Sequence, residues 1–320
     1  MTGTTQLPAT TRAPAGHRPG TATKGEADNR PADQTASAVQ AHAPGTHLGA
    51  QNRPPEDHTS VPHPTGVRAT ARIRAAHNGR TTTLPLLHSD GPFHLRRLRA
   101  RDGRARVSVI GAMSAPLGGD RLELDITAEA RSELEVTTAA ATIALRGSTT
   151  APATYDVRLT VGENASLNWL PQPLISTRGS TLHQSYTVEL ASTSRLLLRE
   201  EQLLGRTAEP PGHLSTRLTV RSDGQLLLDQ HTTYGDPAPA WDGPAVLGGY
   251  RATGQLLVVH PELTADQKAY VFGDDPVEGC AVLTSLANGP GLLATAVAAT
   301  PAHLRRLLDT AIAHALIAQA

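Results

Sequence analysis

Apolar and polar residues alternate with a period of two over much of the chain, most strictly between residues 118 and 146. There Leu122 and Leu124 lie on one side of the backbone and Glu123 on the other. Side chains of a β-strand alternate between its two faces, so the pattern predicts strands with one buried and one solvated face. A polar turn at 129–132 then leads into a second alternating arm.

This unit of strand, polar turn and strand recurs along the chain. Its four copies cover residues 126–136, 159–169, 188–198 and 218–228. The spacing of about thirty residues is typical of stacked supersecondary repeats. We therefore predict a mostly β fold, an elongated scaffold of layered strands that resembles a partial solenoid and carries a few helices. An ordinary β-sandwich, whose strands also recur at short intervals, is the alternative.

The C-terminal part contains separate elements. Residues 264–269 are expected to form a short helix, and 281–286 with 292–298 a hairpin. From Pro301 an apolar stripe at helical spacing predicts a terminal helix that Thr300 caps and that packs on the sheet. Earlier in the chain, the prolines of 170–175 predict a rigid, unpaired ribbon at a corner or an edge.

The first 65 residues are rich in Thr, Ala, Pro and Gly and show no hydrophobic periodicity. Such a composition buries too little apolar surface to offset the entropy of ordering, so we expect a disordered extension over 1–65. Residues 66–320 then form one β domain that ends in the hairpin and the helix. The five histidines of the extension have no spacing that fixes a metal geometry.

Charge and cysteine content narrow the class of protein. The 29 basic and 29 acidic residues balance, so no general attraction to nucleic acid or to an anionic membrane is expected. Cys280 is the only cysteine, which is consistent with a reducing compartment and excludes an internal disulfide. The sequence shows neither a secretory signal nor an apolar run that could span a bilayer, and we expect a cytoplasmic protein.

The sequence contains no recognisable catalytic motif. A phosphate-binding loop, a nucleophile elbow and a His-Glu-x-x-His motif are all missing. Five histidines after residue 66 are dispersed and show no ligand-like spacing: His77, His183, His213, His231 and His260. The alternating acids, such as Glu123 and Asp125, leave open a β-layer hydrolase, which would need two carboxylates close together in a deep cleft. Glu200 and the adjacent Glu201 point to opposite faces of a strand, and Arg206 is a candidate partner for whichever is buried.

Four motifs resemble, in order and spacing, the family of the urease accessory protein UreD, called UreH in some bacteria. They are Gly118-Gly119-Asp120, the small-residue run Thr137–Thr142, the segment from Trp169 to Pro173, and Gly205-Arg206. The match covers about Val67 to the C-terminus, whereas the extension has no counterpart. The sequence departs from the usual family motifs at Ala139, Ile143, Leu145 and His213.

The resemblance implies a non-catalytic maturation scaffold that helps to insert nickel into apo-urease. The implied partners are UreF, the GTPase UreG and the subunits of the urease apoprotein (UreABC). GTP hydrolysis would belong to UreG, which agrees with the missing phosphate loop. Nickel would pass transiently through an internal channel lined by polar side chains, and no cofactor would be tightly bound.

The resemblance also implies site residues. The functionally implicated polar positions of the family match Asp120, Thr142 and Glu200, with Asp229 as a less secure match. Carboxylate and hydroxyl oxygens pass a divalent ion along, whereas a cage of thiolates and imidazoles would retain it. The structural alternatives are that Asp120 caps a turn and that Glu200 pairs with Arg206.

Overall fold

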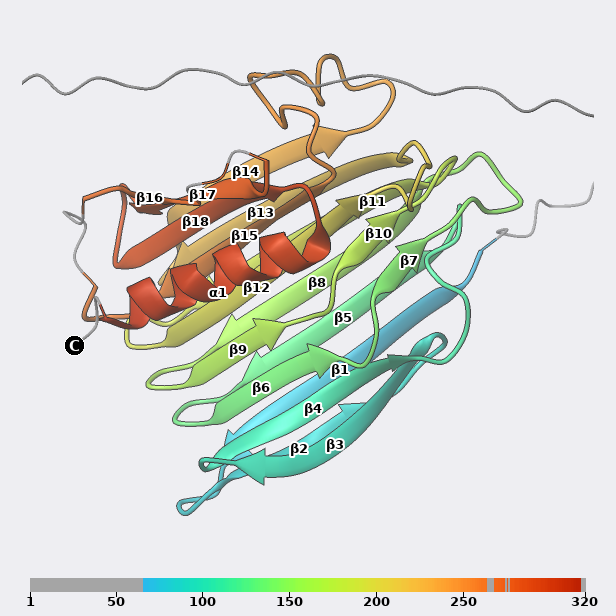
Figure 1. Ribbon diagram of the computed structural model, residues 1–320. Helices are drawn as coiled ribbons and strands as arrows, with labels where there is room; N and C mark the ends of the chain where they lie inside the picture. The colour runs from blue at the N-terminus through green and yellow to red at the C-terminus, as the bar shows by residue number, and fades with distance from the viewer. Residues whose placement is uncertain (1–65, 264–267, 274, 276, 318–320) are drawn as a thin grey trace, which may run out of the picture. The chain divides into compact units, whose positions relative to one another are not determined.

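The computed structural model describes residues 66–263, 268–273, 275 and 277–317 (Figure 1). The expected extension over 1–65 lies outside these residues, and so does most of the expected helix at 264–269. The described residues form 18 β-strands and one α-helix, which confirms the mostly β fold. Among them, no helix combines the length and the apolar character that a membrane span requires.

The strands are arranged in two sheets. The first contains, in spatial order, β14 (Gln225–Tyr234), β13 (His213–Ser222), β11 (Thr181–Leu190), β8 (Ala153–Val161), β5 (Arg121–Ala128), β1 (Arg68–His77) and β2 (Thr82–His88). The five strands from β13 to β1 run parallel to one another. The edge strands β2 and β14 are antiparallel to their neighbours.

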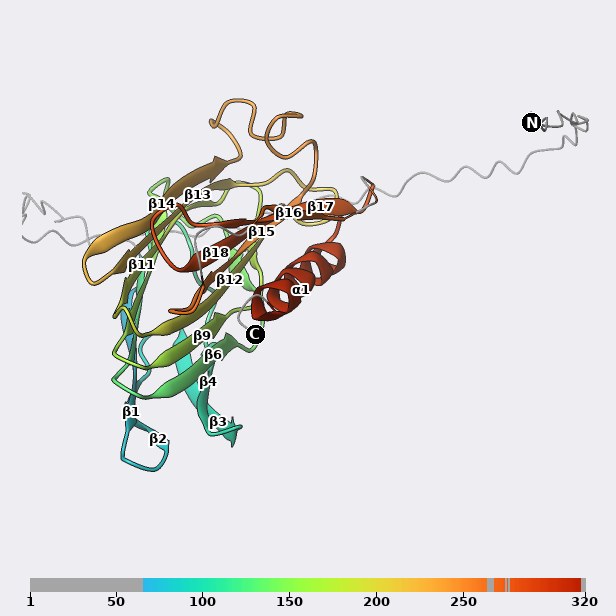
Figure 2. The same ribbon diagram turned by 90° about the vertical axis from the view of Figure 1, so that its left-hand side faces the viewer.

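The second sheet faces the first (Figure 2). Its main path contains β16 (Tyr270–Phe272), β17 (Gly279–Ser285), β18 (Gly291–Ala298), β15 (Ala252–Val259), β12 (Arg195–Leu204), β9 (Ser166–Leu170), β6 (Glu133–Thr138), β4 (Arg104–Gly111) and β3 (Phe93–Arg101). Two short strands, β7 (Thr142–Ala144) and β10 (Leu174–Ser176), pair beside β12. The hairpin of β17 and β18 confirms the one expected from the sequence.

The chain coils between the two sheets, and this explains the thirty-residue repeat. In three of the four units the polar turn carries the chain from a strand of the first sheet to one of the second: β5 to β6, β8 to β9 and β11 to β12. Only the fourth unit, β13 with β14, is a hairpin within one sheet. Successive coils add parallel strands, as in a solenoid, so the layered scaffold is confirmed over the antiparallel sandwich.

Parallel coils stack equivalent positions in register. Five buried aliphatic side chains form one such row across the first sheet: Ile73, Ile126, Leu159, Val188 and Val220. On the solvated face, Arg72, Asp125 and Arg158 form a row of ion pairs. The period-two alternation of the sequence therefore separates an apolar interior from a charged exterior.

The helix α1 (Pro301–Ile317) packs against the face of the second sheet that points away from the first (Figure 2). It contacts β15 and β18 through its predicted apolar stripe, including Leu304, Leu308 and Ala311. A Cβ at Gly254 on β15 would lie only 3.0 Å from a methyl group of Leu308, so glycine lets the helix approach closely. The backbone NH of His303 donates to the Thr300 hydroxyl at 3.2 Å, as expected of the cap.

The proline segment differs from its prediction. Pro171–Pro173 lies inside the second sheet, between β9 and β10, and not at a corner or an edge. Both short strands continue the same coil, because β9 pairs with the start of β12 and β10 with its end. Since proline cannot donate to a ladder, the segment interrupts the sheet between two paired stretches.

Candidate functional site

An opening in the second sheet is built by a mismatch in length between neighbouring coils. Val136, Trp169 and Leu198 are aligned in register, and so are Thr142, Leu174 and Gln202 further along. Between these two rows β12 has three residues (199–201). The coil that contains β9 and β10 has four (170–173), and the coil that contains β6 and β7 has five (137–141). The extra residues leave the ladder, and the prolines and the small side chains at 139–141 do not refill the space.

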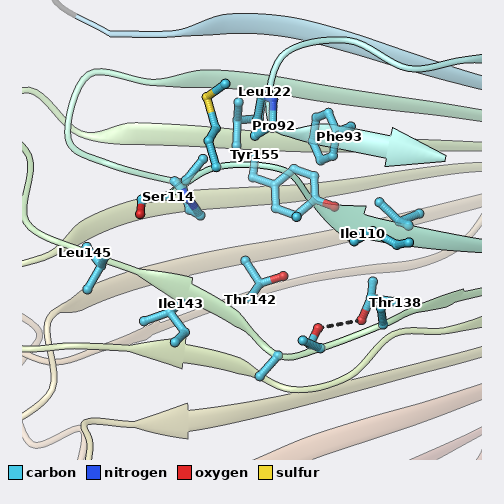
Figure 3. A pocket seen from close by; sticks show the side chains of 18 residues that line it. Pro92, Phe93, Ile110, Ser114, Leu122, Thr138, Thr142, Ile143, Leu145 and Tyr155 are labelled. Atoms are coloured by element: carbon cyan, nitrogen blue, oxygen red, sulfur yellow. Dashed lines mark hydrogen bonds between the residues drawn. The ribbon is translucent and has the colours of Figure 1, made fainter.

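An outer cavity of about 310 Å³ lies at the wide end of this opening (Figure 3). Most of its lining is apolar, and Met113 and Ile143 are exposed at its rim. Figure 3 shows Phe93 and Tyr155 together on one side, and Thr138 and Thr142 along the chain on the other. The rings of Phe93 and Tyr155 lie 5.7 Å apart between centroids, which fixes the position of the tyrosine.

Two smaller cavities of about 20 Å³ continue the outer cavity between the sheets. The middle cavity shares Thr138, Thr142 and Tyr155 with the outer one, and it shares Gln202 with the far one. Each small cavity has about the volume that one water molecule occupies. We call the three cavities together the polar passage, because uncharged polar side chains line most of its inner part, together with Glu200 and Glu201 at the middle cavity.

Glu200 is the carboxylate of the polar passage that faces the first sheet. The alternation of β12 turns it toward the first sheet, where it is 3% exposed. The side-chain NH₂ of Gln255 donates to one carboxylate oxygen of Glu200. Burial raises the pKa of Glu200 from 4.5 to about 7, while hydrogen bonds from Gln255 and Tyr186 act in the opposite direction. Near neutral pH the protonated and the ionised forms of this carboxyl are therefore both populated.

Four further polar side chains come inward from neighbouring strands. Gln184 of β11 donates to the Tyr186 hydroxyl at 3.0 Å. Burial and the nearby charge of Glu200 keep the pKa of Tyr186 well above its usual range, so the phenol stays protonated. At the far cavity, the hydroxyls of Thr216 and Thr232 are hydrogen bonded at 2.7 Å. These inward positions would normally hold apolar residues.

The polar passage contains oxygen atoms that are poised to accept a ligand. Oε1 of Glu200, Oε1 of Gln255 and Oε1 of Gln230 are buried and have no hydrogen-bond partner among the described residues. A buried polar atom without a partner is costly, and such atoms commonly mark a place for water or an ion. Oxygen donors of this kind bind divalent cations without the retention that thiolates produce.

Beside the opening, Glu201 occupies the opposite face of β12, as the adjacent acids predicted. Its side chain is 1% exposed and lies 3.0 Å from Nε of Arg199 and 2.6 Å from Nε of Arg305 on α1. The N–H groups are not aligned with the carboxylate, so these contacts are mainly electrostatic. Arg199 also pairs with Asp309 at 3.0 Å. The helix is thus held over the opening by an ion-pair network around the buried Glu201.

The structure brings together two of the four expected site residues. Thr142 and Glu200 both line the middle cavity. Asp120 is buried elsewhere, and its two oxygens accept the backbone NH groups of Val67 and Leu117, both at 2.8 Å. Asp229 is exposed on the solvated face of β14, where Arg217 pairs with it at 2.7 Å. Asp120 therefore caps a turn, which was the structural alternative to a role in the route of the ion.

Two other expectations are corrected. Arg206 does not pair with Glu200 or Glu201, because it lies on the surface and pairs with Glu209 at 2.8 Å. Glu123 and Asp125 do not line a cleft. Both lie on the open, solvated face of the first sheet and share Arg158, at 3.1 Å and 3.3 Å. The geometry that the β-layer hydrolase needs is therefore not formed by these two acids.

Gln184, Tyr186 and Gln255 were missed by the sequence reasoning. A signal for them exists: each falls on the inward phase of a strand whose other inward residues are mostly aliphatic. Leu182 and Val188, for example, flank Gln184 and Tyr186 on the same face of β11. A polar residue at such a position needs a partner, and partners on other strands can be identified only after the strand order is known.

The raised pKa of Glu200 makes stability depend on pH. Between pH about 4.5 and 7 the unfolded chain releases this proton while the folded protein keeps it. The free energy of unfolding should therefore fall as the pH rises through this window, by up to about 3 kcal/mol from this group. Urea unfolding at pH 5 and pH 7.5 measures the difference. This difference in the free energy of unfolding between the two pH values should shrink in Glu200→Gln. It should persist in the control Glu189→Gln, which changes an exposed acid of β11.

Comparison with known proteins gives a consistent result. The family model described as UreD urease accessory protein matches residues 67–320. Urease accessory protein UreD 2 of Saccharopolyspora erythraea is 62% identical over 248 residues, which are 77% of this chain and 87% of that protein. Urease accessory protein UreD 3 of Streptomyces griseus is 52% identical over 256 residues, covering 77% of this chain and 96% of that protein.

Proposed function

The chain belongs to the UreD family of urease accessory proteins, and we propose that it is a non-catalytic scaffold that conveys Ni²⁺ toward apo-urease through the polar passage. The observation that supports this most is the buried Glu200, set among amide and hydroxyl groups between two otherwise aliphatic sheets. A stable core has no need of a carboxyl at this position, because its burial costs free energy.

The chemistry of the passage suits transit more than storage. Nickel is the cargo, and oxygen donors hold it less tightly than thiolates do. Because the pKa of Glu200 is about 7, an arriving cation displaces the proton at little cost, and a returning proton releases the cation. Thr142 and Tyr155 lie at the junction of the outer and middle cavities, where their hydroxyls replace water ligands of the ion.

In this proposal, partner proteins supply the GTP hydrolysis. The sequence has no phosphate-binding loop, so the proposal assigns GTP hydrolysis to UreG, recruited through UreF, in a cytoplasmic complex that docks on the urease apoprotein subunits. No cofactor is retained in this scheme. The exposed apolar rim at Met113 and Ile143 is a natural place for a partner to cover the outer cavity.

Deletion tests the role itself. In cells that lack this protein and grow at limiting nickel, urease should accumulate as apoprotein, and re-expression of the full chain should restore both its nickel content and its activity. The measurement is nickel per urease active site after purification. Fully metallated urease in the deletion strain would contradict the proposal. Restored activity without any association with UreF or urease in a pull-down would contradict the scaffold.

A further inference from the structure

Two histidines that are thirty positions apart in the sequence meet on the solvated face of the first sheet. His183 lies on β11 and His213 is the first residue of β13, and the two strands are parallel neighbours with Thr181 opposite His213. The ring centroids are 6.2 Å apart and the ring planes are inclined by 76°. The sequence analysis found no ligand-like spacing here because the coil, and not local spacing, brings the rings together.

The separation of the rings suits one shared metal ion. An ion about 2.1 Å from one nitrogen of each imidazole places the two ring centroids about 4.5 to 6.5 Å apart, depending on the angle at the metal. The observed 6.2 Å lies near the upper end of this range, and a rotation of the exposed His183 side chain shortens it. His183 is exposed, and His213 is half-buried, so an ion from solvent can reach the pair. Nδ1 of His213 is buried and has no hydrogen-bond partner among the described residues. A buried ring nitrogen without a partner is costly, and a bound ligand would satisfy it.

An acidic residue near the pair favours a bound cation. Asp236, just beyond β14, is exposed and lies near enough to the His213 ring for its charge to act on that ring. Negative charge beside two imidazoles attracts a cation from solvent.

We propose that His183 and His213, with Asp236 beside them, bind a divalent transition-metal ion such as Ni²⁺, Zn²⁺ or Cu²⁺ on the outer face of the first sheet. Imidazole is a preferred ligand of these ions. Nowhere in the described residues do three His, Cys, Asp or Glu side chains already surround one point, so water completes the coordination and the ion exchanges readily. The site is separate from the polar passage, which lies on the other face of the same sheet.

Residue-resolved footprinting on the full chain tests the site. The probe is Ni²⁺ or Zn²⁺ alone, and the readout is the rate at which diethylpyrocarbonate modifies each histidine, measured by mass spectrometry. At an ion concentration about ten times the dissociation constant, the modification of His183 and His213 should slow about tenfold. Each residue is read separately, so the five histidines of the N-terminal extension do not contribute to the result.

Matched variants complete the test. His183→Ala, at an exposed position, should remove one binding equivalent in equilibrium dialysis and should abolish the protection of His213. His231→Ala is the control, because its ring is engaged with the Ser215 hydroxyl at 2.8 Å on the same face. Unchanged modification rates with metal, or an unchanged number of equivalents in His183→Ala, would overturn the site. Neither outcome bears on the polar passage, since Glu200→Gln should leave this binding equivalent intact.

Discussion

Replacing Glu201 with alanine is expected to lower the free energy of unfolding by about 3 to 5 kcal/mol. The carboxylate is 1% exposed and lies between Arg199, itself 10% exposed, and Arg305 of α1. Its removal leaves two neighbouring guanidinium groups without their buried counter-charge. The remaining acid of the network, Asp309, is 58% exposed and is therefore screened by solvent. Urea denaturation of the full chain measures the loss.

A matched control separates the effect of losing a buried ion pair from that of losing an ion pair at the surface. Glu209→Ala also removes the acidic partner of an arginine, but Arg206 and Glu209 form their pair at the surface, so little change is expected. Arg305→Ala should weaken the anchorage of α1 and cost less than Glu201→Ala, because Arg199 still neutralises the carboxylate. Equal effects of Glu201→Ala and Glu209→Ala would show that the network does not fix the helix.

The second large effect is functional. Glu200→Gln should lower urease activation at limiting nickel by about tenfold or more, the cost usual for disturbing groups that tune a metal site. The amide keeps the size of the side chain but can neither carry charge nor exchange a proton. Folding should not suffer, since burial already disfavours the ionised carboxylate. Urease activity in cells that express the variant with its partners measures the effect.

Asp229→Asn is the control for this prediction. Asp229 was also a candidate from the sequence, as the less secure match, and it lies on the solvated face and pairs with Arg217. Activation should therefore remain normal in this variant. A pull-down must show that both variants still associate with their partners. Loss of association in Glu200→Gln would make the residue structural, and a defect in Asp229→Asn would place the route elsewhere.

The coiled path of the chain between the two sheets was predicted well from the sequence, because the patterns that determine this path are local. Alternation fixes which side chains are buried, and the thirty-residue recurrence requires equivalent strands such as β5, β8 and β11 to stack. The terminal helix was predicted for the same reason: its cap at Thr300 and its apolar stripe are contiguous in the sequence.

The opening in the second sheet could not be predicted in this way. It results from three coils that differ in length between two aligned rows, and no single coil shows the difference. Glu200 was found through a family motif and an adjacent acid, whereas Gln184 and Gln255 have no motif. The same limitation concealed the pair of His183 and His213, since only the register of β11 with β13 places them together.

The most direct test of the route through the polar passage is the nickel content of urease matured in the presence of each variant. Urease should be purified from cells that express the wild-type chain, Glu200→Gln or Asp229→Asn at limiting nickel, and its nickel per active site determined by elemental analysis. We predict normal occupancy with the wild type and Asp229→Asn, and nearly empty sites with Glu200→Gln despite an intact complex. Full nickel occupancy with Glu200→Gln would contradict the account.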